Sequence, residues 1–329
     1  MSTPSDGGAG AGSGPAANEP RPAAPPTGRR ASWSSRKPAQ AAPVYIACYL
    51  AIALIGGQVV GWIRPPLVAG IVVTLMGAAV LLISLLLVLS ICRVAMHPHR
   101  ELAWILGMSI LFSLVRPSVC AFVGKWLGFP AAGMQIAKAL SIVVAPGMAL
   151  LLGNAVLMVW AAFLGKFVSR VIREGKLILP VAAVASLADI ITVFWGVVAH
   201  LTKTAPEVVQ TFSATAPVAP PPNVTAPILS AVGIGDFLFF SLFLAVALRY
   251  AMRPTATMWA TFAMMLVAPF AFLVWPSAPG MPGLPFISAA ALWANWRYVE
   301  FTREEKRALA FTGALVLAAA FGFWAVFHR

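Results

Sequence analysis

Acidic residues are scarce in this chain of 329 residues, which carries ten Asp and Glu against 23 Lys and Arg. Only 10% of its residues are charged and 60% are hydrophobic, which excludes an ordinary soluble globular protein. Cysteine and histidine are scarce too. Cys48, Cys92 and Cys120 show no C-x-x-C spacing, and the four His lie at the ends of apolar runs. The sequence therefore predicts neither a disulfide framework nor a metal site, and it implies no cofactor.

Long apolar runs recur along nearly the whole chain, and most are long enough to cross a bilayer. We therefore predict an all-α fold, a polytopic bundle of nine transmembrane helices. The predicted spans are 43–63, 67–92, 102–124, 139–165, 177–200, 226–248, 256–275, 282–296 and 308–327. Three further features divide the chain: a disordered basic tail, a loop between the fifth and sixth spans, and an extra last helix. The predicted parts are 1–42 (tail), 43–176 (N-terminal helices), 177–300 (catalytic region with loop 201–225) and 301–329 (last helix).

The net charge of +13 does not indicate nucleic-acid binding, because most Lys and Arg lie at span ends. There they orient helices and contact anionic lipid headgroups, so the lipid bilayer is the expected partner. Counting these charges places the N-terminus in the cytoplasm and loop 201–225 outside. The alanine- and proline-rich composition is typical of bacterial proteins from GC-rich genomes, so we expect a bacterial plasma membrane protein.

Segment 126–165 leaves the number of spans open, because Gln135, Lys138 and Asn154 interrupt its apolar character. It can form one long span or two short passes. Two passes would give ten spans and place loop 201–225 inside.

Only three aspartates occur, and two of them, Asp189 and Asp236, lie inside long apolar runs. Such a residue is by default a candidate for a functional site. At about 1.5 Å per helical residue, both lie roughly 17 Å from the same membrane edge if their helices are antiparallel. Two nearby carboxyls in an apolar site share a proton. One can then take a proton from water while the other polarises a peptide carbonyl, which hydrolyses a peptide bond without a metal.

Two flanking motifs add to this pattern. Gly233 and Gly235 precede Asp236 in GIGD, and we expect them to loosen the helix and let another backbone approach. Pro282, Gly283, Leu284 and Pro285 form the motif PGLP before a short apolar run. Its prolines are expected to hold the chain extended, with unpaired backbone groups at membrane depth.

In this order, the three elements resemble the presenilin and signal peptide peptidase family, the GxGD-type intramembrane aspartyl proteases. SLADIITVF supplies the first aspartate, Asp189, and GIGDFLFFS supplies the second, Asp236, while PGLP (282–285) stands where the family has P-A-L. The resemblance covers roughly 177–296, and the stretch after G-x-G-D is more similar to presenilins. It implies that both aspartates hydrolyse peptide bonds within transmembrane segments of other proteins. Gly233 to Gly235 and Pro282 to Pro285 would shape the docking surface for an unwound substrate, and no obligatory subunit is implied.

The chain departs from the family pattern at several points. Ala188 replaces the tyrosine that precedes the first aspartate, and Gly283 replaces the alanine of P-A-L, which we expect to be a mild change. An apparent span at 308–327 follows where presenilins end. The family has nine spans with the aspartates on the sixth and seventh, whereas charge counting places them on the fifth and sixth unless 126–165 is double.

Other functions must be weighed against proteolysis. Prepilin peptidases also contain G-x-G-D, but a lysine follows two residues later, whereas Phe237 and Leu238 follow here. An ion- or proton-coupled transporter could use the same aspartates, with Arg116 and Lys138 as counter-charges. A catalytically silent scaffold of the same fold is a third possibility, which the missing tyrosine keeps open.

Overall fold

The computed structural model describes residues 41–62, 66–116, 119, 124–125, 128–143, 146–194, 213–215, 231–267 and 282–299, with scattered positions between 301 and 314. Its described part is mainly helical, as predicted. Three helical segments are long and apolar enough to cross a membrane: Ile71–Arg93, Ala149–Val171 and Gly175–Val193. The predicted tail 1–42, except for its last two residues, and most of the predicted span 308–327 lie outside the described residues.

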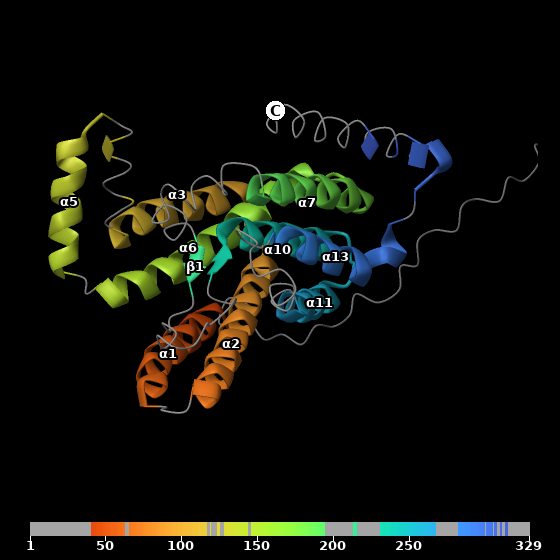
Figure 1. Ribbon diagram of the computed structural model, residues 1–329. Helices are drawn as coiled ribbons and strands as arrows, with labels where there is room; N and C mark the ends of the chain where they lie inside the picture. Colours follow the sequence, from red (N-terminus) through yellow and green to blue (C-terminus); the bar gives the residue numbers. More distant parts are fainter. Residues whose placement is uncertain are drawn as a thin grey trace, which may run out of the picture. The chain divides into compact units, whose positions relative to one another are not determined.

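The described elements follow one another along the chain as helices with one short pair of strands (Figure 1). They are α1 (Ala41–Trp62), α2 (Pro66–Arg93), α3 (Pro98–Val115), α5 (Pro130–Val143), α6 (Pro146–Val168), α7 (Ile178–Phe194), β1 (Ser213–Thr215), β2 (Ala231–Gly233), α10 (Ile234–Arg249), α11 (Pro254–Val267) and α13 (Leu284–Asn295), with short 3₁₀ turns η2 (Ser169–Val171), η3 (Gly175–Leu177) and η4 (Trp296–Tyr298). Many helices begin at a proline, because the first helical residue needs no N–H donor.

Helices α6 and α10 form the centre of the packed core, and small residues bring them together. A Cβ added at Gly165 of α6 would lie 2.8 Å from the Cβ of Ser241 and 3.0 Å from the backbone N of Leu242 in α10. The Ser241 hydroxyl donates a 2.5 Å hydrogen bond to the carbonyl of Ala162. Small residues of this kind let helix backbones approach closely. In a membrane such close packing holds helices together, because lipid tails are as apolar as the helix side chains.

Two sequence predictions for this region are wrong in detail. Within the predicted span 226–248, residues 231–233 form strand β2, and α10 starts only at Ile234. The fold is therefore not purely α. Strand β2 pairs antiparallel with β1, which lies within the predicted loop 201–225, and Ser213 is opposite Gly233. Pairing satisfies backbone N–H and C=O groups that a helix would otherwise satisfy internally.

Helices α3 and α6 run antiparallel, which bears on segment 126–165. Glu101 near the start of α3 accepts a hydrogen bond from Arg170, just beyond the end of α6. At the other end, Arg116 donates to Asn154 near the start of α6. The start of α3 and the end of α6 therefore share one side. Segment 126–165 itself contains most of two helices, α5 and α6, so these contacts fix the end of α6 beside the start of α3, while one pass or two through the segment stays a prediction.

Helix α13 lies beside α7 and α10 (Figure 1) and is fixed at several points along its length. The Ser288 hydroxyl donates to the carbonyl of Ala182 in α7 at 3.3 Å. At its end, the fully buried Asn295 side chain donates to the Thr257 hydroxyl in α11 and accepts from the Arg253 N–H. A buried amide satisfied in this way defines the position of the helix that carries it.

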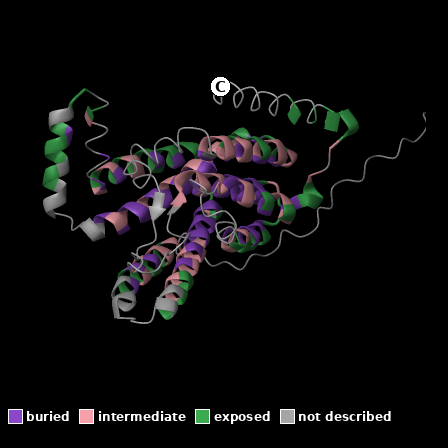
Figure 2. Ribbon diagram, viewed as in Figure 1, coloured by how far each residue is buried: buried purple, intermediate pink, exposed green. Residues whose placement is uncertain are grey.

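Much apolar surface remains exposed on the outer helices. Figure 2 shows α10 largely buried and α5 largely exposed. On α3, Trp104, Leu106 and Ile110 are 46%, 57% and 63% exposed. Contiguous apolar surface of this kind is unusual in a soluble monomer and is compatible with contact to lipid.

Candidate active site

Asp189 lies in the C-terminal half of α7 and is half-buried. Its Oδ2 accepts a 3.0 Å hydrogen bond from the backbone N–H of Leu284, the first residue of α13. The first N–H groups of a helix have no partner within that helix, so a carboxylate there satisfies one of them. The positive end of the α13 dipole also stabilises a negative charge at this place.

Asp236 lies at the start of α10. The sequence had instead predicted a position well inside a helical span, 226–248. It is the third residue of α10, and its Oδ2 accepts a 3.1 Å hydrogen bond from the backbone N–H of Gly233. The side chain therefore closes the first turn of its own helix, as an acidic residue three positions after the N-cap commonly does. Each aspartate thus lies at the N-terminus of a helix, Asp189 at α13 and Asp236 at α10.

Two consecutive residues, Gly283 and Leu284, connect the aspartates. A Cβ added at Gly283 would lie 2.5 Å from Oδ1 and 2.7 Å from Cγ of Asp236, so this glycine lies directly against that carboxylate. The next residue donates to Asp189. The three motifs found in the sequence therefore come together at one place. An alanine methyl at position 283 would press on the Asp236 carboxylate, so whether Gly283 is a mild replacement for alanine stays a prediction.

The remaining residues of PGLP differ from their predicted conformation. Gly283 has helical dihedral angles (φ −80°, ψ −33°), and Pro285 lies in the first turn of α13. The motif therefore starts a helix and does not hold 282–285 extended, since Pro is favoured in a first turn. The Leu284 N–H, predicted to be unpaired, is the one bound to Asp189.

Gly233 and Gly235 also lie differently from the prediction that they loosen a continuous helix. Gly233 is the extended N-cap residue of α10 (φ −64°, ψ 148°), at the end of β2. At Gly235, an added Cβ would meet no atom within 4 Å. Packing among the described residues therefore does not explain Gly235, which lies one residue from Asp236.

The two aspartates lie at the same height above one common end of the helices. Asp189 is eleven residues beyond the start of α7, Asp236 is thirteen residues before the end of α10, and Leu284 is eleven residues before the end of α13. At about 1.5 Å per residue, all three distances are about 16–20 Å. The ends lie together: a Cβ added at Gly175, shortly before α7, would lie 3.2 Å from Tyr250, directly after α10, and the Arg253 N–H donates to Asn295 at the end of α13. Across a hydrocarbon core of about 30 Å, this height is near the middle.

Other residues singled out in the sequence lie elsewhere. Ala188 is exposed, so the position of the family tyrosine faces outward from the described helices. Arg116 is buried and donates to Asn154 at 2.7 Å, and Lys138 is exposed on α5. Neither cation has a described interaction with an aspartate. Within the described residues, no group of three or more His, Cys, Asp and Glu side chains could hold a metal ion.

Sequence reasoning missed two groups that position the candidate site. The first is the strand pair β1–β2, whose three-residue strands are too short to give an alternating pattern. The second is the pair Ser288 and Asn295, which fixes α13 against its neighbours. A signal for the second was available, because both are polar residues within an otherwise apolar run, where an unsatisfied side chain would be costly.

Comparisons of the chain with protein-family models, with curated proteins and with solved structures found no match.

Proposed function

We propose that this protein is an intramembrane aspartyl protease that hydrolyses peptide bonds within transmembrane segments of other proteins, with Asp189 and Asp236 as its catalytic pair. The observation that carries the proposal is the contact of Gly283 and Leu284 with both carboxylates. Three motifs from distant parts of the sequence meet at one place and at one height. A structural role for either aspartate alone would not require the third motif to touch both.

In the proposed reaction the pair holds one proton. The ionised carboxylate removes a proton from a water molecule as its oxygen attacks the peptide carbonyl carbon. The protonated carboxyl transfers its proton to the carbonyl oxygen, which gives a gem-diol intermediate. The first carboxyl then gives its proton to the amide nitrogen while the second carboxylate removes a proton from a gem-diol hydroxyl. The C–N bond breaks, and the pair again holds one proton.

The substrate would enter as an extended segment. Strand β2 ends at Gly233, directly before the turn that carries Asp236, and the described sheet has only two strands. An extended peptide can add to the free edge of such a sheet through main-chain hydrogen bonds. The open space beside Gly235 would admit the substrate backbone near the carboxylates.

A membrane location follows from the same proposal. We propose a polytopic bundle of nine spans in a bacterial plasma membrane, with the presenilin-like fold that the motifs suggest. The three long apolar segments and the exposed apolar side chains of α3 support a membrane protein. The height of the aspartates above the helix ends supports a site near the middle of the bilayer.

Transport by the same aspartates is the alternative, and a silent scaffold is the third possibility. A transporter needs charges or polar groups along a pathway through the bundle. Arg116, the buried cation that would suit this reading, donates to Asn154 and not to an aspartate in the described structure. The packing of Gly283 against Asp236 has no evident purpose in ion movement, so the geometry favours hydrolysis.

The test is a cleavage assay with purified full-length protein in liposomes and a generic transmembrane peptide. Asp189→Asn and Asp236→Asn keep the side-chain volume and still accept the N–H hydrogen bonds, but cannot act as a base. We expect both variants to keep the thermal stability of the wild type and to lose cleavage. A hydroxyl-bearing transition-state analogue should inhibit the wild type. Substantial cleavage by Asp236→Asn would refute the assignment; proton flux without cleavage by any form would favour transport.

A further inference from the structure

A second polar site lies at the opposite end of the helices from β2, where several helix ends converge. A cavity of about 350 Å³ opens there, a size within the usual range of small-ligand pockets. Its wall contains the cations Arg93, Lys166, Arg170 and Arg249, from the ends of α2 and α6, from η2 and from the end of α10. All four belong to segments that the charge count assigns to the cytoplasmic side.

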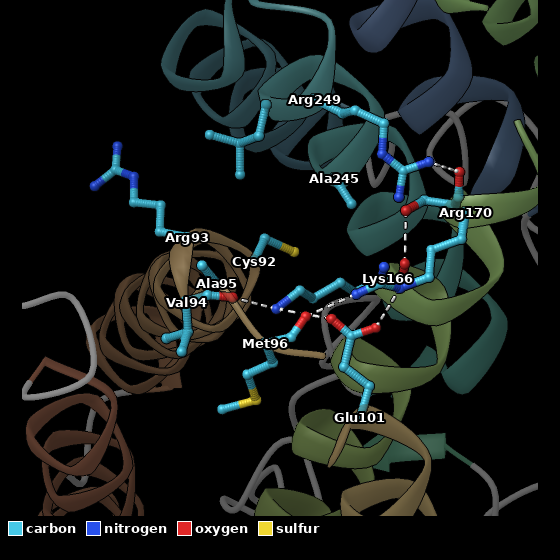
Figure 3. A pocket seen from close by; sticks show the side chains of 12 residues that line it. Cys92, Arg93, Val94, Ala95, Met96, Glu101, Lys166, Arg170, Ala245 and Arg249 are labelled. Atoms are coloured by element: carbon cyan, nitrogen blue, oxygen red, sulfur yellow. Dashed lines mark hydrogen bonds and ion pairs between the residues drawn. The ribbon is translucent and has the colours of Figure 1, made fainter. Parts of the chain in front are cut away.

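One carboxylate faces these cations. Glu101 is fully buried, forms a 3.2 Å ion pair with Lys166 and accepts a 2.7 Å hydrogen bond from Arg170 (Figure 3). Burial raises the pKa of Glu101, but the Arg170 hydrogen bond and the Lys166 charge leave it below its ordinary value. Glu101 is therefore ionised at neutral pH. Among the described residues that line the cavity it is the only acid, so the lining cations outnumber the acids by three.

Helix dipoles do not remove this excess. The C-terminal ends of α2, α6 and α10 each contribute about half a negative charge at most, and the start of α3 contributes about half a positive one. Together they offset about one of the three charges. Cations at helix C-termini are common because they stabilise the helix dipole. That stabilisation does not require a cavity lined by more cations than acids.

The arginines also have donors to offer a ligand. The described hydrogen bonds of Arg170 go to Glu101 and the Met96 carbonyl, and that of Arg249 goes to the Ser169 carbonyl. A guanidinium carries more N–H groups than these bonds use, in a fork that matches phosphate oxygens. Arg249 and Arg93 are exposed at the rim, whereas Lys166 is buried, so the cavity is open to a ligand from outside.

We propose that this cavity binds an anionic phosphate group, either the headgroup of an acidic phospholipid or a free phosphate. Basic pockets between helices at the cytoplasmic membrane surface are suited to such headgroups. Lys166 and Glu101 form the fixed base of the site, Arg170 and Arg249 flank the phosphate, and Arg93 lies at the rim (Figure 3). The proposal is independent of the aspartate pair.

The test is native mass spectrometry of the delipidated full-length protein, titrated with phosphatidylglycerol or with phosphatidylcholine of the same acyl chains. We expect tighter binding of phosphatidylglycerol, and a loss of about fivefold in affinity for each cation removed, or roughly 25-fold in the double variant Arg93→Gln/Arg249→Gln. Arg249→Lys keeps the charge and should stay within about twofold of the wild type. The matched control is Arg100→Gln/Arg173→Gln, two exposed cations on the same side that do not line the cavity.

A second arm separates the two sources of phosphate. Inorganic phosphate is titrated in a thermal-shift assay with the same variants. Stabilisation by inorganic phosphate that depends on Arg93 and Arg249, without preference between the lipids, would assign the site to free phosphate; the reverse result assigns it to a headgroup. Equal losses in the cavity and control variants, or no variant-dependent binding of any probe, would overturn the proposal.

Discussion

At the scale of single residues, the candidate site depends on backbone N–H groups at the N-termini of α13 and α10. These N–H groups have no partner within their own helix and can donate to a carboxylate. Leu284 offers an N–H to Asp189, and Gly233 offers one to Asp236. Each hydrogen bond fixes one oxygen of its carboxylate. Gly283 completes the arrangement by having no side chain where the Asp236 carboxylate lies. The position of the Asp236 carboxylate is therefore set by backbone atoms and by the lack of a side chain at Gly283.

For the replacement of Gly283 by alanine, the geometry of the site and the family resemblance give opposite predictions. Alanine restores the family's P-A-L, so the resemblance alone predicts retained activity, whereas the geometry predicts a displaced Asp236 carboxylate. We expect kcat to fall by about tenfold to a hundredfold, with little change in KM or thermal stability. Steady-state cleavage assays measure this. The control is Gly107→Ala, where an added Cβ meets no atom within 4 Å. Unchanged or increased kcat in Gly283→Ala would show that the carboxylate is not held as described.

At the scale of the elements, sequence patterns identified the helices well and their ends poorly. Apolar runs predict helices because a segment of about 20 apolar residues can be recognised as a membrane-length helix from its composition alone. The start of α10 was missed, since residues 226–233 are as apolar as the helix that follows. Pairing with β1 distinguishes residues 231–233 from the helix, and it depends on partners such as Ala214, 18 residues before Val232, that no local pattern reveals.

The candidate site shows the same division. Asp189 and Asp236 could be singled out from the sequence, because a carboxylate in an apolar run is costly wherever it lies. The role of Gly283 could not, since its importance comes from a neighbour 47 residues earlier in the chain. The convergence of Lys166 and Arg170 on Glu101 was equally hidden, because their charges had an adequate explanation at span ends.

The packing of α6 against α10 gives a prediction at this scale. Around Gly165, the atoms that an added Cβ would meet include backbone atoms of Leu238 and Leu242, which cannot rotate away. We expect Gly165→Ala to destabilise the protein by about 1–3 kcal/mol, the usual cost of overpacking. Thermal unfolding in detergent measures it, with Gly107→Ala again as control, because there alanine should be neutral or slightly stabilising. A Gly165→Ala protein as stable as the control would mean that the helices lie further apart.

At the scale of the whole molecule, polar contacts connect the basic segments of the sequence with one another. Residues 94–101 meet 166–170 through Glu101 and Lys166, and Arg249 meets 169. Charge counting had assigned these segments to one side from composition alone, and the contacts join them independently. The height of the aspartates was estimated from the start of α7 and from the ends of α10 and α13. These three helix ends lie on this common side.

Cysteine labelling in intact bacterial cells tests this arrangement. In a background with Cys48, Cys92 and Cys120 replaced by alanine, cysteines are introduced singly at Arg100, Arg173, Arg253 and Gln210, the last within the predicted loop 201–225. The first three are exposed in the structure and lie at the basic ends of the helices. We expect an impermeant maleimide to label Gln210→Cys in intact cells and the other three only after lysis, because positively charged segments remain in the cytoplasm.

Labelling of Arg173→Cys but not Arg100→Cys in intact cells would require a second pass through 126–165, and would contradict the ion pair between Glu101 and Arg170. Labelling of all three together, with Gln210→Cys protected, would preserve the packing and reverse the orientation, so the cavity would then meet the outer leaflet.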